Sequence, residues 1–275
     1  MSTFSSLKKN EWQNYAKTFK GFRPPWKPSS ERITIYRKLI KRYVKGNKVL
    51  VLGATPEVRD MLARLKFNAT LIDISPMMVK AMTSLRRTKS NEKIIIHNWL
   101  TAQFKDKFDL ILGDSVVNNL HPKQLNTFFK QLTKWMAPQG VLILQNSVLL
   151  TPLSSIKISL EQIVKKIKNQ PKGYKNYLDK AHDYLAYWYS TAKNHLNDLG
   201  KLEILLAQLY QKGILTKKEF FMMKMGFNSP TIISFYQDKE FRKILSRHFI
   251  VREVSEESQR RTYKDFYRFY VLNNK

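Results

Sequence analysis

The chain of 275 residues contains no cysteine. This absence excludes disulfide bonds, thiolate nucleophiles and cysteine-ligated metals, and it fits a reducing compartment, so we expect a soluble cytoplasmic protein. The histidines show none of the spacings of a metal site, so we expect no metal. No apolar run reaches the ~18 to 20 residues that a membrane-spanning helix needs, and the first residues, MSTFSSLKKNEW, lack the apolar segment of a signal peptide.

Acidic residues are scarce. The chain has 21 Asp and Glu against 49 Lys and Arg, which gives a formal net charge of +28 at pH 7. Such a charge raises the local concentration of polyanions and favours binding to nucleic acid or an anionic membrane surface. A lysine-rich composition that runs through the whole chain is the simpler explanation. The predicted helix after residue 29 illustrates the choice, since its basic face, read as either a solvated surface or a phosphate-contacting stripe, holds Arg32, Arg37, Lys38, Lys41, Arg42 and Lys45.

Glycine is also rare, and one of the nine glycines marks the most informative stretch of the sequence. Residues 48–52 (KVLVL) are almost continuously apolar, as in a strand buried on both faces of a parallel sheet, and Gly53 ends them. Apolar residues then recur at helical spacing, and residues 69–72 predict a second strand. Asp73 follows twenty positions after Gly53, a spacing that suits a carboxylate binding both ribose hydroxyls of an adenosine group. The pattern predicts a βαβ unit with its ligand beyond the carboxyl ends of the strands.

The turn after the first strand argues against a dinucleotide. A dinucleotide fingerprint has glycine at its first, third and sixth positions, where this chain has Gly53, Thr55 and Val58. Pro56 lacks an N–H for a phosphate, and Glu57 brings negative charge to the place where phosphates bind. The turn therefore disfavours a pyrophosphate but suits a ligand with ammonium and sulfonium groups. Pro56 and Glu57 are also favourable first-turn residues of any helix, an explanation that leaves Gly53 and Asp73 unexplained.

Five segments then occur in order: VLVLGATPEVRDML, LIDISPMMVKAM, HNWL, FDLILGDSVVNNL and MAPQGVLIL. Together, over residues 48–145, they resemble the motif series of class I S-adenosylmethionine-dependent methyltransferases, more narrowly a bacterial group whose glycine turn reads LGATPE. The resemblance implies a Rossmann-like, seven-stranded, mainly parallel sheet flanked by helices. Residues 151–235 read as mostly helical and do not belong to the minimal sheet, so they predict a helical insertion after the fifth strand. The resemblance also implies S-adenosylmethionine as cofactor and methyl transfer, by in-line displacement, to an acceptor that the sequence does not identify.

The resemblance also assigns the cofactor site. Many members carry an acid where this chain has Val51, and Glu57 is a candidate to replace it. Asp73 would hold the ribose, Asn98 the adenine amino group through its carbonyl oxygen, and Trp99 would pack against the ring. Met78 is a further candidate, although it lies on the buried stripe of its helix, for which core packing is the simpler explanation. The full predicted cofactor set is Gly53, Ala54, Thr55, Glu57, Asp73, Ile74, Met78, Asn98, Trp99 and Asp114.

Two residues are candidates for catalysis. Asp114 follows the predicted strand 108–113, where an acceptor meets the methyl group, and is the first choice for a residue that orients or deprotonates the acceptor. A turn carboxylate bonded to nearby backbone explains Asp114 almost as well. His121 is the weaker candidate base, since its ordinary pKa suits the task but its place before Pro122 also suits a helix start.

The acceptor is predicted only by class. The loop after Asp114 lacks the Asn or Asp, Pro-Pro and aromatic motif of enzymes that methylate nucleic-acid amino groups, and we expect a small molecule rather than RNA or protein. The alternative function is a non-catalytic, basic protein that binds nucleic acid or a membrane surface on the same fold. A nicotinamide enzyme is a weaker option, opposed by the turn. The oligomeric state stays open.

We expect four parts along the chain: an N-terminal helical segment over the cofactor cleft (1–46), the cofactor-binding α/β core (47–150), a helical insertion (151–235), and a C-terminal helix with the last two strands (236–275). Within the insertion, helices are predicted over 154–168, 174–198, 202–211 and 216–225. An insertion after the fifth strand leaves the sheet at its ligand edge, so we expect a lid whose Tyr187 and Tyr189 face the loop around Asn118.

Overall fold

The computed structural model describes residues 19, 27–149, 195–217, 220, 232–257 and 267–275. The strands follow the apolar runs of the sequence. Five of them lie side by side and are all parallel: β1 (Lys48–Leu52), β2 (Asn68–Asp73), β3 (Lys93–Ile96), β4 (Phe108–Asp114) and β5 (Met136–Leu149). β10 (Tyr267–Asn274) pairs antiparallel with β5, and β9 (Phe249–Glu256) pairs antiparallel with β10.

The resulting strand order is β3-β2-β1-β4-β5-β10-β9, and β8 (Tyr236–Gln237) extends the pairing of β5 at its carboxyl end. This order confirms the predicted mainly parallel sheet of seven strands. The strand order reverses between β1 and β4: β1 is followed by β2 on one side, and β4 by β5 on the other. In such sheets a ligand binds beyond the carboxyl ends of the two strands at this point.

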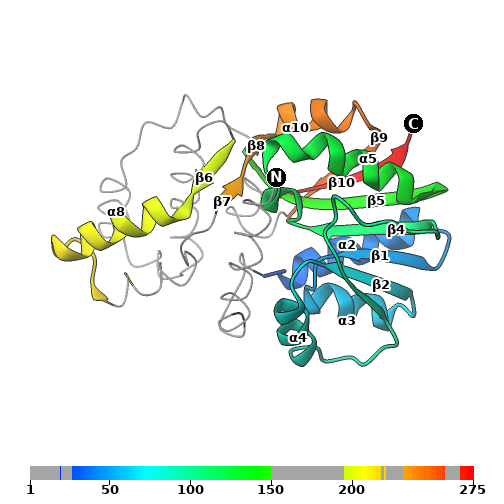
Figure 1. Cartoon of the computed structure of the whole chain (residues 1–275), viewed down its shortest axis with the longest axis horizontal. Coiled ribbons are helices and arrows are strands. Elements are labelled where there is room, and N and C mark those ends of the chain that lie inside the picture. The colour runs from blue at the N-terminus through cyan, green and yellow to red at the C-terminus, as the bar shows by residue number, and fades with distance from the viewer. Residues whose placement is uncertain (1–18, 20–26, 150–194, 218–219, 221–231, 258–266) are drawn as a thin grey trace.

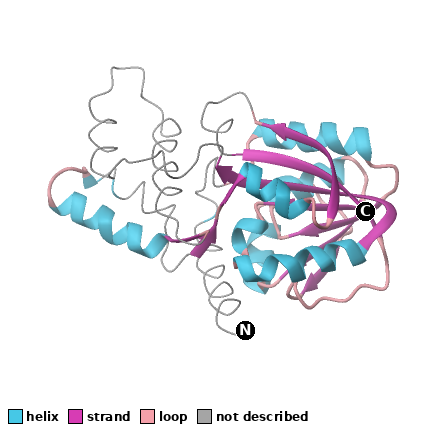
Figure 2. Cartoon of the chain, turned by 90° about the horizontal axis from the view of Figure 1, so that it is seen from above, coloured by secondary structure: helices cyan, strands magenta, loops and turns pink. Residues whose placement is uncertain are grey.

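Helices cover both faces of the sheet (Figures 1 and 2). One layer holds α2 (Ser30–Tyr43), α3 (Pro56–Arg64) and α4 (Pro76–Ser84), and the other holds α5 (Leu125–Trp135) and α10 (Asp238–Leu245). α3 and α4 each begin with proline at the first helical position, and Ser75 caps α4 by accepting a bond from the Met78 N–H. Two short 3₁₀ turns, η2 (Val117–Asn119) and η3 (Pro122–Gln124), connect β4 to α5.

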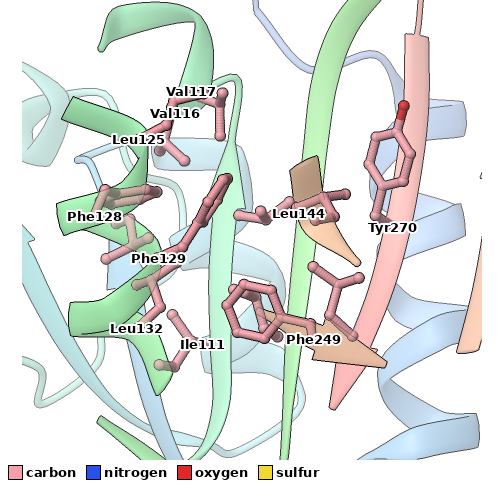
Figure 3. Packing of buried hydrophobic residues seen from close by; sticks show 14 of the residues in the cluster. Ile111, Val116, Val117, Leu125, Phe128, Phe129, Leu132, Leu144, Phe249 and Tyr270 are labelled. Carbon is pink, nitrogen blue, oxygen red and sulfur yellow. The ribbon is translucent and has the colours of Figure 1, made fainter. Parts of the chain in front are cut away.

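Alternate residues of the central strands point into two separate cores. Leu50 and Leu52 of β1 belong to the core under α5 and α10, whereas Val49 and Val51 belong to the core under α2, α3 and α4. β1 is therefore buried on both faces, as its apolar run predicts. Figure 3 shows the first core, in which Phe129 of α5 meets Phe249 of β9 edge to face with ring centroids 5.8 Å apart.

The described part of the predicted insertion is anchored beside the loop after β4. β6 (Leu196–Asp198) pairs antiparallel with β7 (Ile232–Ser234), and α8 (Leu199–Gln211) follows β6 and extends away from the sheet (Figure 1). α8 confirms the helix predicted over 202–211. The helix predicted over 174–198 is wrong at its end, because main-chain pairing with β7 makes residues 196–198 a strand.

Several predictions lie outside the described residues. These are the helix over 154–168, most of those over 174–198 and 216–225, the first 18 residues, and both Tyr187 and Tyr189. The division into four parts stays a prediction. In the part of the chain that the structure does describe, no helix combines the length and the apolar character needed to cross a membrane.

Candidate functional site

The turn after β1 depends on a residue without a side chain. Gly53 has a φ of +90°, in the region that L-residues rarely adopt, and its N–H donates to the Ile72 carbonyl at 2.9 Å. A Cβ at this position would meet only the Trp99 ring, at 3.9 Å, so the glycine is required by the backbone conformation rather than by crowding. The bond to Ile72 holds the turn against the carboxyl end of β2.

Asp73 lies at that end of β2 and is almost completely buried. Its Oδ1 accepts the Ser75 N–H at 2.8 Å. Burial raises the pKa of Asp73 to about 6, against the lowering effect of the backbone N–H groups of Ser75, Ala54 and Ile74. The structure thus brings together the predicted residues Ala54, Asp73 and Ile74 around one carboxylate.

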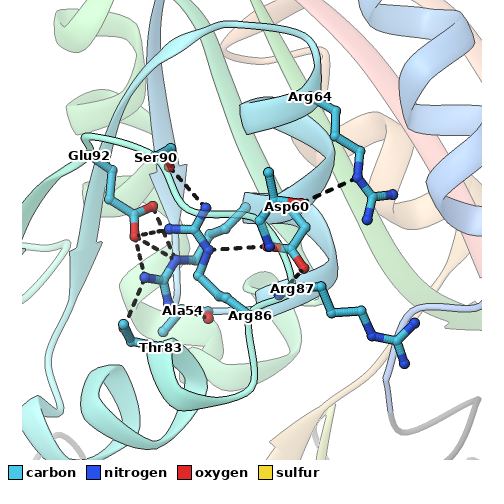
Figure 4. A network of polar contacts seen from close by, with 10 residues as sticks. Ala54, Asp60, Arg64, Thr83, Arg86, Arg87, Ser90 and Glu92 are labelled. Atoms are coloured by element: carbon cyan, nitrogen blue, oxygen red, sulfur yellow. Dashed lines mark hydrogen bonds and ion pairs between the residues drawn. The ribbon is translucent and has the colours of Figure 1, made fainter.

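A buried network of charged side chains contacts the turn at Ala54 (Figure 4). Arg59 of α3 is 1% exposed and donates to the Ala54 carbonyl at 3.3 Å, to Thr83 Oγ1 at 2.9 Å and to the Glu92 carboxylate at 3.1 Å. Arg86 bonds the same Glu92 at 2.6 Å and Asp60 at 3.2 Å. The two cations of the network, Arg59 and Arg86, balance its two carboxylates, Glu92 and Asp60. The network therefore fixes the turn without adding net charge. These residues could not be recognised from the sequence, because helical periodicity marks only apolar positions.

Asp114, at the end of β4, is bound by the N-terminal helix α2. Its Oδ1 accepts the Tyr36 hydroxyl at 2.9 Å and Arg32 Nη1 at 3.4 Å. Arg32 Nε also donates to Glu257 Oε1 at 2.5 Å, and Ser29 Oγ donates to Glu257 Oε2 at 3.1 Å. Arg32 and Glu257 are 2% and 0% exposed, so the surface interpretation of the basic face of α2 is wrong for Arg32.

Burial and the neighbouring charges fix the protonation of this group. Burial and then the Asp114 charge raise the pKa of Tyr36 far above its ordinary value, so its hydroxyl remains a donor. Burial opposes the charge on Arg32, but the carboxylates of Asp114 and Glu257 outweigh it and raise the pKa of Arg32. The guanidinium also lies over the Tyr267 ring, 4.6 Å from its centroid.

Three buried polar atoms near Asp114 lack a hydrogen-bond partner: Arg32 Nη2, Glu57 Oε2 and Gln145 Nε2. Glu57 is close enough for Asp114 to raise its pKa, although burial is the main cause of that rise. Gln145 is the β5 residue paired with Asp114, and its Oε1 accepts the Ser115 hydroxyl at 2.9 Å. Buried polar atoms are rarely left unsatisfied, since each costs about 1 to 3 kcal/mol, so these three atoms need an explanation, such as a ligand that bonds them. An acceptor and two donors at one sheet edge fit a ligand with an ammonium and a carboxylate.

Other predicted cofactor residues have bonds within the protein. Trp99 Nε1 donates to the Ile72 carbonyl at 3.1 Å, and its ring lies 6.1 Å from that of Phe128. Asn98 Oδ1 accepts the Leu100 N–H at 2.9 Å, in the manner of an Asx turn. Met78 is 6% exposed in the core under α4. Cofactor contacts by Trp99, Asn98 and Met78 remain predictions.

The loop after Asp114 also has a structural role. His121 precedes η3, and its Nδ1 accepts the Lys123 N–H at 3.2 Å, which is the helix-start role considered for it. Asn118 is buried; its amide bonds the N–H and the carbonyl of Ser147, each at 3.0 Å, and the Ser234 carbonyl at 2.8 Å. Asn118 therefore ties the loop to β5 and β7.

Comparison with known proteins identifies the family. The model of a family described as "Methyltransferase domain" matches residues 47–219. Comparison with curated protein sequences gave no match. Similar solved structures include the N-methyltransferase NodS from Bradyrhizobium japonicum WM9 in complex with S-adenosylhomocysteine, at 12% identity and a TM-score of 0.54 over 98% of each chain.

Two further structures have the same fold. The 1,6-didemethyltoxoflavin-N1-methyltransferase from Burkholderia thailandensis has 9% identity and a TM-score of 0.59, over 100% of this chain and 91% of the other. An S-adenosylmethionine-dependent methyltransferase from Clostridium acetobutylicum ATCC 824 has 14% identity and a TM-score of 0.53, over 96% and 98%. At these identities the likeness concerns the fold. Since the family model covers more than half of the sequence, the chain belongs to the methyltransferase-domain family and is an S-adenosylmethionine-dependent methyltransferase.

Proposed function

We propose that the protein methylates a small-molecule nucleophile held at the carboxyl ends of β4 and β5. S-adenosylmethionine supplies an electrophilic methyl group on a sulfonium. The observation that carries the location of the site is the group of unpartnered buried atoms beside Asp114, namely Arg32 Nη2, Glu57 Oε2 and Gln145 Nε2. They give the site both donors and an acceptor that folding alone does not use.

Asp73 is assigned to the ribose. One of its oxygens already accepts the Ser75 N–H, which fixes the carboxylate, and it lies against the Gly53 turn. A carboxylate that accepts two hydroxyl groups makes charge-assisted hydrogen bonds, which are stronger than neutral ones. Ile74, which follows it and is partly exposed, is placed for the adenine side of the site.

The ammonium and carboxylate of the cofactor are assigned to Glu57 and Arg32. Val51, where many members carry an acid, is 2% exposed in the core, so no carboxylate comes from β1. Glu57, in the first turn of α3, supplies one instead, with its Oε2 buried and without a partner. Arg32 Nη2 supplies the complementary donor from α2.

Asp114 is assigned to the acceptor. Two donors, Tyr36 and Arg32, both bond its Oδ1 and fix the orientation of the carboxylate. A fixed carboxylate suits positioning, and positioning of the reacting atoms at ~3 to 3.5 Å supplies much of the rate acceleration in an in-line displacement.

Calorimetric titration with S-adenosylhomocysteine tests these assignments. Asp73→Ala and Glu57→Gln should each weaken binding by about 1.5 to 3 kcal/mol, the size of a hydrogen bond to a charged group. Asp106→Asn is the matched control, because Asp106 is 70% exposed and pairs only with the exposed Lys48 in the described structure. Unchanged affinity in a folded variant would remove that residue from the site, and a folded wild-type protein that does not bind S-adenosylhomocysteine would contradict the function itself.

The insertion is assigned to acceptor selection. Its described strand β7 is tied to the loop after β4, since Ser234 Oγ donates to the Val117 carbonyl at 3.0 Å. This contact supports a lid at the ligand edge. If Tyr187 and Tyr189 face the acceptor, Tyr187→Ala and Tyr189→Ala should lower kcat/KM for the acceptor and leave S-adenosylhomocysteine affinity unchanged. Equal kcat/KM in both variants and the wild type would contradict the assignment.

A further inference from the structure

The charge balance at the site is opposite to that of the whole chain. Among the described residues, four carboxylates lie around the proposed cofactor and acceptor positions: Glu57, Asp73, Asp114 and Glu257. The cations that act on them from outside the balanced Arg59 network are Arg32 and Lys27. The described part of the site is therefore negatively charged, although the whole chain carries a net charge of +28.

We infer that the acceptor is an amine that reacts as the neutral base and becomes a cation on methylation. This inference rests on the proposed function and narrows its acceptor class. It depends on where charge lies before and after methyl transfer.

An amine that reaches the site as the ammonium ion first loses one proton to water; the lone pair of the neutral nitrogen then forms the new N–C bond, and the C–S bond breaks with its electron pair remaining on sulfur. The positive charge moves from sulfur to nitrogen, so the reacting pair carries one positive charge before and after the step, and the carboxylates stabilise it in both states. With a phenolate, carboxylate or phosphate oxygen, an anion has to enter among the carboxylates, and the step then cancels the positive charge that they stabilise. The field of the site favours the first case.

The cations in the described part of the site already act on carboxylates of the protein. Arg32 bonds Glu257 through Nε and Asp114 through Nη1, and its Nη2 is assigned to the cofactor carboxylate. Lys27 acts on Glu57. Within the described part of the site, no further cation is placed to neutralise an acidic acceptor.

The hydrogen-bonding groups of the site favour an amine, as its charge does. An amine brings N–H donors, which need acceptors that aim the nitrogen lone pair at the methyl group. Tyr36 and Arg32 both donate to Oδ1 of Asp114, so we assign Oδ2 to an N–H of the amine. The methylated product leaves as the ammonium ion, or loses its proton to water.

The test uses methyl-labelled S-adenosylmethionine and the low-molecular-weight pool of a cell extract, divided by ion exchange into cationic, neutral and anionic fractions. The label should enter compounds of the cationic fraction and resist mild base, as N-methyl groups do and methyl esters do not. Label in the anionic fraction, in base-labile esters or in added RNA would overturn the inference. So would the absence of transfer to the cationic fraction by protein that binds S-adenosylhomocysteine, a result that leaves the proposed function standing.

Two variants test the assignment of Asp114. At saturating S-adenosylmethionine, Asp114→Asn should lower the rate of labelling of the cationic fraction by about tenfold or more, because it removes one negative charge and changes the group that aims the amine. Asp106→Asn, an equal change at the opposite end of β4 on an exposed side chain, should leave the rate within about twofold. Equal rates for Asp114→Asn and the wild type would overturn the role of Asp114. Benzylamine and benzoate, of similar size and opposite charge, complete the test, since only benzylamine should inhibit the labelling.

Discussion

Lowering the pH from 7 to 5 should weaken S-adenosylhomocysteine binding about tenfold, through Asp73. Burial raises the pKa of this carboxyl to about 6, so about nine-tenths of the molecules carry it ionised at pH 7 and about one-tenth at pH 5. In the proposed assignment the ribose hydroxyls donate hydrogen bonds to Asp73, so binding should select the ionised form. Ligand binding at pH 5 must therefore release nearly one proton, and at pH 7 about a tenth of one.

The folding stability of the unliganded protein should change with pH in the opposite direction to its ligand affinity. A folded-state pKa above the ordinary value of 3.8 means that folding favours the protonated carboxyl. This contribution to stability is complete below about pH 4 and is lost as the pH rises through about 6. Relative to Asp73→Asn, the wild-type protein should thus lose stability over the same interval in which it gains affinity.

Calorimetry at pH 5, 6, 7 and 8, in two buffers of different ionisation enthalpy, measures the affinity and the number of protons released. Asp73→Asn should remove most of the pH dependence. Glu57→Gln should weaken binding at each pH and leave much of the slope, although the pKa of Glu57 is also raised by burial. Equal affinity at pH 5 and pH 7 in folded wild-type protein, or an unchanged slope in Asp73→Asn, would refute the reasoning.

Three further predictions concern stability. Arg59→Met leaves the buried Glu92 carboxylate without its main partner and should lower the free energy of unfolding, measured with urea, by about 3 to 5 kcal/mol; a loss under ~1 kcal/mol would contradict the role of the network. Asn118→Ala leaves buried main-chain groups of β5 and β7 unpaired and should cost roughly 1 to 3 kcal/mol, so an unchanged thermal midpoint would disprove the anchor. Gly53→Ala should cost roughly 1 to 3 kcal/mol through its φ of +90°, and a neutral effect on urea unfolding would show that the turn relaxes.

The βαβ unit around Gly53 could be predicted because its signals are local. The apolar run of β1, the glycine, the proline at the start of α3 and the acid after β2 lie within residues 48–73, and each has one main structural meaning. Asp73 and Asp114 were found because parallel strands place their carboxyl ends at one edge. Their roles in binding and catalysis stay predictions, as does the narrower group with an LGATPE turn.

Arg32 and Glu257 could not be found in this way. Arg32 was placed with the basic face of α2, yet it lies at i and Tyr36 at i+4 on the buried stripe that continues through Leu39 and Ile40. That spacing was the available signal. Nothing local marks Glu257, because its partner is 225 positions away and only the tertiary fold brings them together.

The same separation has a consequence for synthesis of the protein on the ribosome. Arg32 is made early, but Glu257 follows β9, and β9 joins the sheet only by pairing with β10, which is made later still. A nascent chain can fold β1 to β4 and form the Gly53 turn while Arg32 still lacks one of its two carboxylates and the Phe269 ring is not yet present to pack against Tyr36. The half of the site assigned to the ribose can therefore form before the half assigned to the methionine end, and a ribosome-bound intermediate should be unable to retain the cofactor until the final strand has emerged.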